Sequence, residues 1–383
     1  MESIADKVAI IGMGCTKFGE NWEKSAEDMI VDAAYEAFED AGVSPQDIQA
    51  AWVGTTSSGS TGQSLSRPLK LQYIPITRVE NACATAQDAL RNACFAVAAG
   101  MYDVVLALGF EKLKDSGLSG LPGSQVGVIG AGGTAPGGFA LAAMRYFHQY
   151  DVGKESLAKI AVKNHHNGSL NPKAHFQSEI TVEQVLNAPM IADPLGLFDC
   201  CPTTDGAAAA VICRKDMAAK FNPDYVVIKG LGLSVGPGTG RMDPTYDFVH
   251  FPETIRASQQ AYQQAGITNP FKEISLAEVH DCFTITELLI YEDLGFVKKG
   301  EAKPAIDDGV FTLEGELPVN TDGGLKSFGH PIGASGLRML YEIYKQLQGK
   351  AGARQVKKAE LGLAHNLGGL PGSFTCSVVI LGR

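Results

Sequence analysis

The strongest constraint on the fold is an internal repeat, because the same order of strand, helix and strand occurs twice along the chain. In the first half, the apolar stretch of residues 7–12 (KVAIIG) is followed by a segment of helical periodicity that ends at Gly42. In the second half, residues 225–230 (YVVIKG) are followed by a similar segment that ends at Gly266. Glycine just past the last turn is a common helix C-cap, since it adopts the left-handed conformation without strain. The repeat predicts a duplicated α/β unit.

The similarity continues beyond each helix into a second strand. Residues 48–54 (IQAAWVG) follow the first helix, and residues 274–280 (ISLAEVH) follow the second. Any α/β protein shows some similarity of this kind by chance. Helices that end in glycine at matching places in both halves make duplication the better interpretation.

A different kind of sequence separates the two halves. Residues 116–138 are rich in glycine and lack helical or strand periodicity, and residues 139–190 indicate short helices with loops. A small-residue strand within residues 199–213 (DCCPTTDGAAAAVIC) then returns to close the first half. We therefore predict an N-terminal half of residues 1–115 plus 195–218, an inserted loop domain of residues 116–194 and a C-terminal half of residues 219–383.

Composition excludes several classes of function. The formal net charge of -10 argues against a general nucleic-acid binder, because neutralising phosphates requires clustered Lys and Arg. No apolar run approaches the roughly 20 residues that span a bilayer, and the acidic N-terminus does not resemble a signal peptide. The eight cysteines include no C-x-x-C pair and suggest no disulfide framework. We expect a cytoplasmic protein with no metal site, no membrane span and no nucleic-acid partner.

Cys83 is the candidate nucleophile. It lies where a β-branched stretch meets a helix, within residues 76–100 (ITRVENACATAQDALRNACFAVAAG). At that place the unpaired backbone N–H groups and the positive end of the helix dipole favour the thiolate over the thiol. A single Cys is more often a small buried hydrophobe, and Cys94 on the same helix is interpreted in that way.

Two histidines and a second cysteine gather in the second half. The strand that ends at His280 runs into a loop containing Cys282 before the next helix (AEVHDCFTITEL), at a place where α/β folds collect chemistry. His330 lies in a glycine-rich loop (GGLKSFGHPIGASG), where Pro331 disfavours helical geometry and the glycines allow close approach of a ligand. A lone His in a loop is more often an exposed residue with no specific role, but the sequence around His330 favours a functional role.

The C-terminal residues 361–383 (LGLAHNLGGLPGSFTCSVVILGR) indicate a strand, a glycine-rich turn and a returning strand. Asn366 and the amides of Gly368 and Gly369 are candidates for binding substrate or its oxyanion, and His365 also borders this turn. Cys376 lies within the returning strand and is interpreted as core.

These residue types fit acyl transfer to sulfur. A thiolate needs a His to accept its proton, and the negative thioester oxygen needs fixed N–H donors. A second acid/base must move a proton at the α-carbon of the incoming acyl group. Cys83, His280, Cys282 and His330 together supply these roles.

The chain resembles the thiolase superfamily, in the branch of sterol-carrier-protein-2-type thiolases and acetyl-CoA acetyltransferases. The resemblance covers essentially the whole chain and is carried by IGMGCTKFGENWEKS, VENACATAQDAL, DVVLALGFEK, DGAAAAVIC, HDCFTITELLIYEDLGF and PVNTDGGLKSFGHPIGASG. It implies an α/β thiolase fold, in which two duplicated halves form a five-layer α-β-α-β-α core beneath an inserted loop domain, and a homodimer. It also implies that Cys83 is acylated, His330 activates it, His280 helps form an oxyanion hole and Cys282 is the acid/base.

The resemblance implies a thiolase that makes or cleaves a 3-oxoacyl-CoA through an acyl-Cys83 intermediate, with acetoacetyl-CoA as the default substrate. Coenzyme A is then a co-substrate, and no cofactor is bound permanently. Some relatives work with a small zinc-ribbon/OB-fold partner protein, so such a partner is considered for this chain.

Several alternatives remain open. The turn HNLGGLPGSF departs from the compact glycine run of many relatives. Branched or aromatic 3-oxoacyl-CoAs, such as 2-benzoylsuccinyl-CoA, are therefore alternative substrates. A decarboxylating ketosynthase, a retro-aldolase acting on steroid-derived thioesters, and a non-catalytic acyl-CoA-binding subunit are further alternatives. The presence of both Cys83 and Cys282 favours a thiolase over these.

Overall fold

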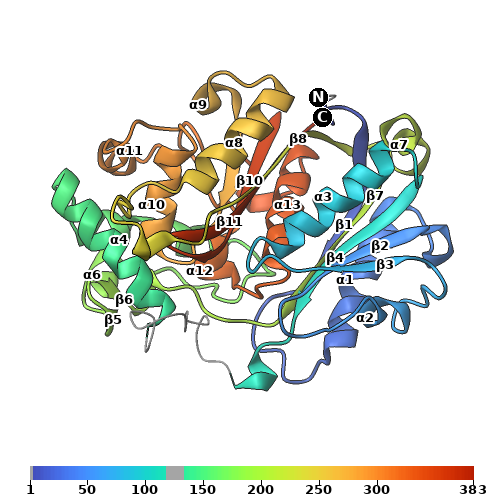
Figure 1. Cartoon of the computed structure of the whole chain (residues 1–383), viewed down its shortest axis with the longest axis horizontal. Helices are drawn as coiled ribbons and strands as arrows, with labels where there is room; N and C mark the ends of the chain where they lie inside the picture. The colour runs from blue at the N-terminus through green and yellow to red at the C-terminus, as the bar shows by residue number, and fades with distance from the viewer. Residues whose placement is uncertain (1–2, 118–132) are drawn as a thin grey trace.

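In the computed structural model, which describes residues 3–117 and 133–383, a nine-stranded mixed sheet runs through the whole molecule (Figure 1). Its strand order is β3-β2-β4-β7-β1-β8-β11-β10-β9. The strands are β1 (Val8–Cys15), β2 (Ala50–Gly54), β3 (Ile76–Val79), β4 (Val104–Glu111), β7 (Gly206–Arg214), β8 (Val226–Val235), β9 (Leu276–Val279), β10 (Leu361–Leu370) and β11 (Ser373–Gly382).

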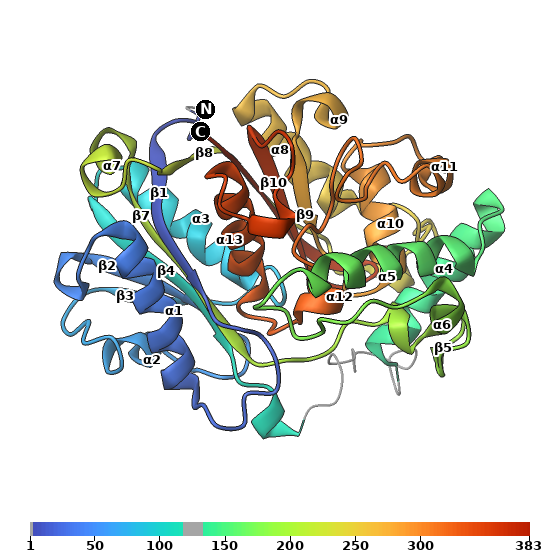
Figure 2. The ribbon, with the colours of Figure 1, turned by 180° about the vertical axis from the view of Figure 1, so that it is seen from behind.

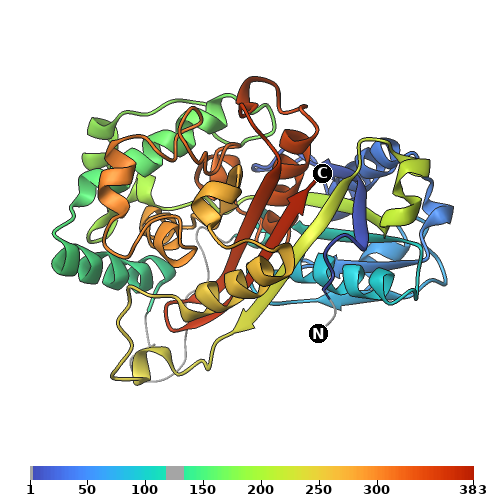
Figure 3. The same cartoon turned by 90° about the horizontal axis from the view of Figure 1, so that it is seen from above.

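The predicted duplication is confirmed by the pairing of these strands. The order β2-β4-β7-β1 in the first half corresponds to β9-β10-β11-β8 in the second. In each half the first pair is parallel and the next two pairs are antiparallel. The halves meet at the centre of the sheet, where Ala9 and Ile10 of β1 pair with Val227 and Val226 of β8 (Figure 3). Only β3, at the edge of the first half, lacks a counterpart among the described strands.

Helices complete the five layers that the resemblance implies. The outer helices are α1 (Ala26–Ala41) on the first half and α8 (Pro252–Ala265) on the second, while α3 (Thr85–Ala98) and α13 (Ser335–Leu347) pack together between the two halves. Both α1 and α8 end at the expected glycines, with φ of 66° at Gly42 and 72° at Gly266. The fold is therefore the predicted α-β-α-β-α arrangement, with its two β layers joined edge to edge at β1 and β8.

Burial on both faces explains why the strands are apolar along their whole length. Every residue of β1 and β4 is buried. Along β1, Ala9 and Ile11 belong to the apolar cluster beneath α1, whereas Val8 and Ile10 belong to the cluster that contains α3. Successive side chains of β1 therefore point to opposite faces of the sheet, and each face packs against a different layer of helices.

The insertion lies beside the second half (Figure 2). Within it are α4 (Ala135–Tyr150), α5 (Lys154–Ser169), α6 (Val182–Leu186) and β5 (Met190–Ala192), next to α10 (Thr284–Asp293), α11 (Ala302–Asp307) and α12 (Gly324–Phe328). The partner strand of β5 is β6 (Leu195–Gly196), just beyond the predicted end of the insertion. The chain returns through β7, which lies between β1 and β4 as expected for the strand that closes the first half. Most of the glycine-rich segment predicted as a loop lies outside the described residues, and the three domain boundaries stay a prediction.

Short helices complete the description: α2 (Gln63–Ser66), α7 (Lys215–Phe221) and α9 (Pro270–Glu273). Across the described ranges, no helix combines the length and apolarity needed to cross a bilayer.

Glycines allow the outer helices to pack directly on the sheet, and they do so at equivalent places in the two halves. A Cβ on Gly12 or Gly14 of β1 would lie 2.3 or 2.1 Å from a carbonyl oxygen of α1. A Cβ on Gly230 or Gly232 of β8 would lie 2.3 or 1.9 Å from a carbonyl oxygen of α8. These distances are far below van der Waals contact, so a side chain at these positions must push the helix away.

We predict that Gly232→Ala destabilises the protein, because the new methyl group collides with the backbone of α8 at Ala257. Overpacking of this kind costs about 1–3 kcal/mol, which urea denaturation measures as a lower midpoint. Gly196→Ala is the matched control, because a Cβ there has its nearest neighbour at 3.4 Å, the Lys154 Nζ. Equal midpoints for the two variants would contradict the packing argument.

Candidate active site

A sharp backbone turn presents Cys83 just before the first turn of α3. Ala82 has a positive φ of 49°, an uncommon conformation for a residue other than glycine. The turn is held by Thr85, whose hydroxyl accepts from the Asn81 N–H at 2.8 Å and donates to the Ala82 carbonyl at 2.5 Å. The backbone N–H groups of Gly369 and of Cys83 itself lower the pKa of the Cys83 thiol. Both groups therefore stabilise negative charge on the sulfur.

Gly368 and Gly369, at the end of β10, form the wall opposite this turn. A Cβ on Gly368 would lie 2.5 Å from the Asn81 oxygen and 2.8 Å from the Cys83 nitrogen, so only glycine fits. Gly369 has a φ of 103°, which also favours glycine. The structure thus places both predicted glycines against Cys83.

His330 contacts Cys83 from the second half of the chain. Its Nε2 lies 3.2 Å from the Cys83 Sγ, and its Nδ1 lies 2.7 Å from the Ser335 Oγ. The Ser335 hydroxyl donates its only proton to the Pro331 carbonyl at 3.0 Å, so it must accept from His330. The proton of the neutral ring is therefore on Nδ1, and the lone pair of Nε2 faces the thiol.

His280 completes the cluster. The ligand atoms of Cys83, His280 and His330 all lie within 4.8 Å of one another, and the two imidazole rings are edge-on at 5.3 Å between centroids. The Asn366 amide nitrogen lies 3.1 Å from the His280 Nδ1. When this N–H donates to Nδ1, His280 keeps its proton on Nε2, where it can donate to an oxyanion. Asn366, a predicted substrate contact, lies behind His280 and orients it.

Cys282 is buried, and its Sγ lies 3.6 Å from the Thr286 hydroxyl. Burial raises the pKa of Cys282 well above its usual value, and the nearby Cys83 raises it further. At neutral pH the group is therefore a thiol that can donate a proton. His365, in contrast, binds the Thr254 hydroxyl at 3.0 Å, on the side of the sheet that α8 covers.

Burial also decides the charge of the Cys83–His330 pair. Burial raises the pKa of Cys83 to about 12, although the N–H groups of Gly369 and Cys83 oppose the shift. Burial, with a smaller effect of Arg338, lowers the pKa of His330 to about 3. The resting pair is thus a neutral thiol and a neutral imidazole. The backbone N–H groups lower the pKa of Cys83, as expected near a helix N-terminus, but desolvation of the sulfur outweighs them.

Asp281, between His280 and Cys282 in the HDCF motif, connects this motif to α12 and α5 by hydrogen bonds. Its carboxylate accepts from the backbone N–H groups of Leu325 at 2.6 Å and Lys326 at 3.1 Å, in the helix that leads to His330. It also accepts from Asn164 of α5, which donates to Glu287 as well, at 2.8 and 2.6 Å. Neither Asp281 nor Ser335 was among the residues predicted from the sequence. The sequence did contain one indication of a role for Asp281, which is its position between His280 and Cys282.

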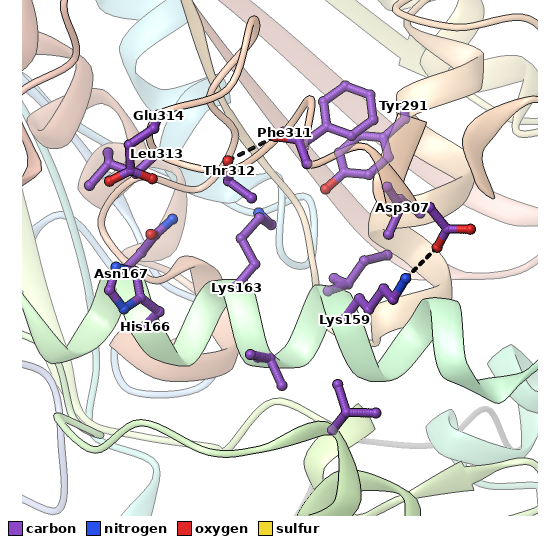
Figure 4. Close-up of a pocket in the computed structure, with 15 residues that line it drawn as sticks. Lys159, Lys163, His166, Asn167, Tyr291, Asp307, Phe311, Thr312, Leu313 and Glu314 are labelled. Carbon is purple, nitrogen blue, oxygen red and sulfur yellow. Dashed lines mark hydrogen bonds and ion pairs between the residues drawn. The ribbon is translucent and has the colours of Figure 1, made fainter. Parts of the chain in front are cut away.

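A separate cavity of about 400 Å³ lies between α5, α10 and α11 (Figure 4). Lys159 and Asp307, which line the cavity, form an ion pair at 2.6 Å. Lys163, another lining residue, forms an ion pair with Glu287 at 2.7 Å. None of the predicted site residues lines this cavity. The chemically functional groups therefore gather at Cys83, away from this opening.

Comparison with known proteins identifies the family. The thiolase N-terminal domain matches residues 8–216, and the thiolase C-terminal domain-like family matches residues 240–383. The chain belongs to the thiolase family. It is 42% identical to the acetyl-CoA acetyltransferase of Methanothermobacter thermautotrophicus, over 98% of this chain and 99% of that protein. It is 35% identical to sterol carrier protein 2 of Gallus gallus, over 98% of this chain and 72% of that protein.

Among solved structures, the chain is similar to the Ltp2-ChsH2(DUF35) aldolase, with a TM-score of 0.86 and 29% identity over 100% of this chain and 99% of that one. The predicted thiolase fold and the sterol-carrier-protein-2/acetyltransferase branch are thereby confirmed. The protein is an acyltransferase of the thiolase type.

We predict that alkylation of Cys83 by iodoacetamide accelerates about tenfold per pH unit from about pH 6 to about pH 9. The reason is that the thiolate fraction rises about tenfold per unit below the raised pKa of about 12. Peptide mass spectrometry after timed quenching measures the rate at Cys83 alone. A rate that levels off within this range would show a preformed thiolate–imidazolium pair instead.

Proposed function

We propose that this enzyme makes or cleaves a 3-oxoacyl-CoA through an acyl group carried on Cys83, with acetoacetyl-CoA as substrate. The observation that carries the proposal is the 3.2 Å contact between the Cys83 Sγ and the Nε2 of His330, whose tautomer Ser335 fixes. An imidazole with its lone pair on a thiol is the arrangement that activates a nucleophilic sulfur.

In the first half-reaction of synthesis, His330 takes the proton of Cys83 as the sulfur attacks the carbonyl carbon of acetyl-CoA. The carbon–sulfur bond to Cys83 forms while the carbonyl oxygen becomes negative, and the N–H groups of Gly369 and Cys83 are the proposed donors to that oxygen. The bond to the CoA sulfur then breaks. The Cys282 thiol gives its proton to the leaving CoA thiolate and becomes a thiolate itself.

In the second half-reaction, the Cys282 thiolate takes a proton from the α-carbon of another acetyl-CoA. His280 donates from Nε2 to the enolate oxygen that develops. The enolate carbon attacks the acyl group on Cys83, so the new carbon–carbon bond forms as the bond to sulfur breaks, and His330 returns its proton to Cys83. Cleavage is the same sequence in reverse, with coenzyme A as the co-substrate.

Acetoacetyl-CoA is supported by the 42% identity to a protein named acetyl-CoA acetyltransferase. Branched or aromatic substrates such as 2-benzoylsuccinyl-CoA stay an alternative because of the altered C-terminal turn. There Phe374 is buried and packs edge-on against Phe251 and at a tilt to Phe139, at 4.8 and 6.0 Å between ring centroids.

Aldol cleavage is a second candidate reaction, favoured by the similarity to the Ltp2-ChsH2(DUF35) aldolase. An aldol cleavage needs no acyl acceptor on the enzyme, whereas this site aligns a Cys with a His as such an acceptor. The assembled cluster also argues against a non-catalytic acyl-CoA-binding subunit.

We also propose a homodimer, a cytoplasmic location and the domain boundaries predicted above. The dimer is supported by the open edge of the sheet at β3, which pairs only with β2 among the described strands. The name of the Ltp2-ChsH2(DUF35) aldolase includes a DUF35 component, which supports a small zinc-ribbon/OB-fold partner for this chain as well.

Cys83 is expected to form the acyl adduct. Intact-mass analysis after brief incubation with acetyl-CoA should show one added acetyl group per chain, and Cys83→Ala should show none. Cys94→Ala is the matched control, since Cys94 is a core thiol on the same helix. An adduct that maps to any other cysteine would overturn the assignment.

Cys282→Ala is expected to separate the two half-reactions. The variant should still accept an acetyl group onto Cys83, but net turnover should fall about 10²–10⁴-fold, the usual loss of a general acid/base. His280→Ala should lose about 10²–10³-fold, as for removal of one oxyanion donor. Single-turnover and steady-state assays measure the two effects. If Cys282→Ala retained near wild-type turnover, the acid/base would lie elsewhere.

A further inference from the structure

The cluster of Cys83, His280 and His330 presents one sulfur and two imidazole nitrogens, a donor set that suits zinc. Their ligand atoms all lie within 4.8 Å of one another, and the Cys83 Sγ is 3.2 Å from the His330 Nε2. Around a tetrahedral zinc ion, with Zn–S of about 2.3 Å and Zn–N of about 2.0–2.1 Å, neighbouring donors are about 3.3–3.6 Å apart. Side-chain shifts of about 1 Å or less would bring the three atoms to that spacing.

His330 already has the second hydrogen bond that metal-binding histidines use to orient the ring, whereas His280 must change its tautomer to gain one. Ser335 accepts from the His330 Nδ1, which leaves the lone pair of Nε2 directed at the cluster. For His280 to offer a lone pair on Nε2, its proton must move to Nδ1 and find an acceptor. The Asn366 amide can supply one by turning over, because its Oδ1 has no hydrogen-bond partner among the described residues.

The three side chains of the cluster differ in their exposure to solvent. His280 and His330 are buried, whereas Cys83 is partly exposed. An ion would therefore enter from the Cys83 side and keep a water there, as in zinc sites with three protein ligands. Within the described part of the chain no carboxylate belongs to the cluster, so Mg²⁺ and Ca²⁺, which need oxygen ligands, are poor candidates.

We propose that the acyl-free enzyme can bind one Zn²⁺ per chain through Cys83, His280 and His330, in place of the neutral Cys83–His330 pair, and that this ion and the acyl group exclude each other. On binding, the Cys83 thiol releases its proton to solvent and a zinc–sulfur bond forms, with no change of oxidation state. The acyl group needs the same sulfur, so zinc holds the enzyme in an inactive form. The site rests on these three side chains alone and does not depend on which 3-oxoacyl-CoA the enzyme uses.

The test is a competition titration of the full, chelator-stripped protein with ZnCl₂ against a chromophoric chelator. We expect one zinc per chain, and an affinity reduced at least about 100-fold in Cys83→Ser and in His330→Ala. Asn366→Leu, which removes only the partner of His280, should lose about 10–100-fold. Cys94→Ser and His250→Gln are matched controls that keep full affinity, since Cys94 is core and His250 pairs with Asp247 at the surface.

Two further measurements use the wild-type protein, so they remain decisive if a variant does not fold. Zinc should slow iodoacetamide labelling of Cys83, and Co²⁺ should give a thiolate-to-metal charge-transfer band that prior acetylation by acetyl-CoA abolishes. Zinc binding that survives Cys83→Ser, or labelling of Cys83 at an unchanged rate, overturns the metal site. Acetylation of Cys83 without any zinc binding would reject the metal site alone, and zinc binding without acetylation would reject the proposed acyl transfer alone.

Discussion

The packing of α3 against α13, in the space between the two halves, is the interaction on which the site depends. Cys83 lies just before α3 and His330 lies shortly before α13, so each half contributes one member of the proposed reacting pair. At the helix contact, the Gln87 amide nitrogen of α3 lies 3.9 Å from the Met339 sulfur of α13, and both residues are fully buried. Because the Sγ–Nε2 distance of 3.2 Å spans the two halves, any slippage between these helices would separate the proposed nucleophile from its proposed base.

The two halves of the duplicated fold pack their outer helices on the sheet in the same way. Each half builds its outer crossing from the same elements, with strand glycines beneath small helical residues such as Ala37 in α1 and Ala257 in α8. Close crossings of this kind leave little freedom for the helices to move, since protein interiors are packed to crystal density. Rigid halves are the reason that a site assembled across them keeps its geometry.

Burial then sets the charge state. Placing a thiolate and an imidazolium in a dry site costs more than placing two neutral groups there. The enzyme thus keeps the pair neutral at rest, and in the proposed reaction the N–H groups of Gly369, Cys83 and His280 are the donors to the charge that develops. Donors that are in place beforehand cost no reorganisation at that moment. Cys83 and His330 are also two of the three ligands of the inferred zinc site, where Cys83 binds as a thiolate after losing its proton.

The sequence by itself determined the duplication, the apolar strands, the glycine-capped helices and the identity of the main candidates, including Cys83 and His330. These features depend on local periodicity and on residue types that few other positions share, and the family resemblance covered the whole chain. Only the tertiary structure decided the tautomer of His330, through Ser335, and the place of Asn366 behind His280. It also added the desolvation of Cys83, which opposes the N–H groups expected to favour the thiolate. The physical reason is that hydrogen-bond partners and desolvation come from segments far apart in the chain, whereas a helix terminus can be recognised from a few neighbouring residues.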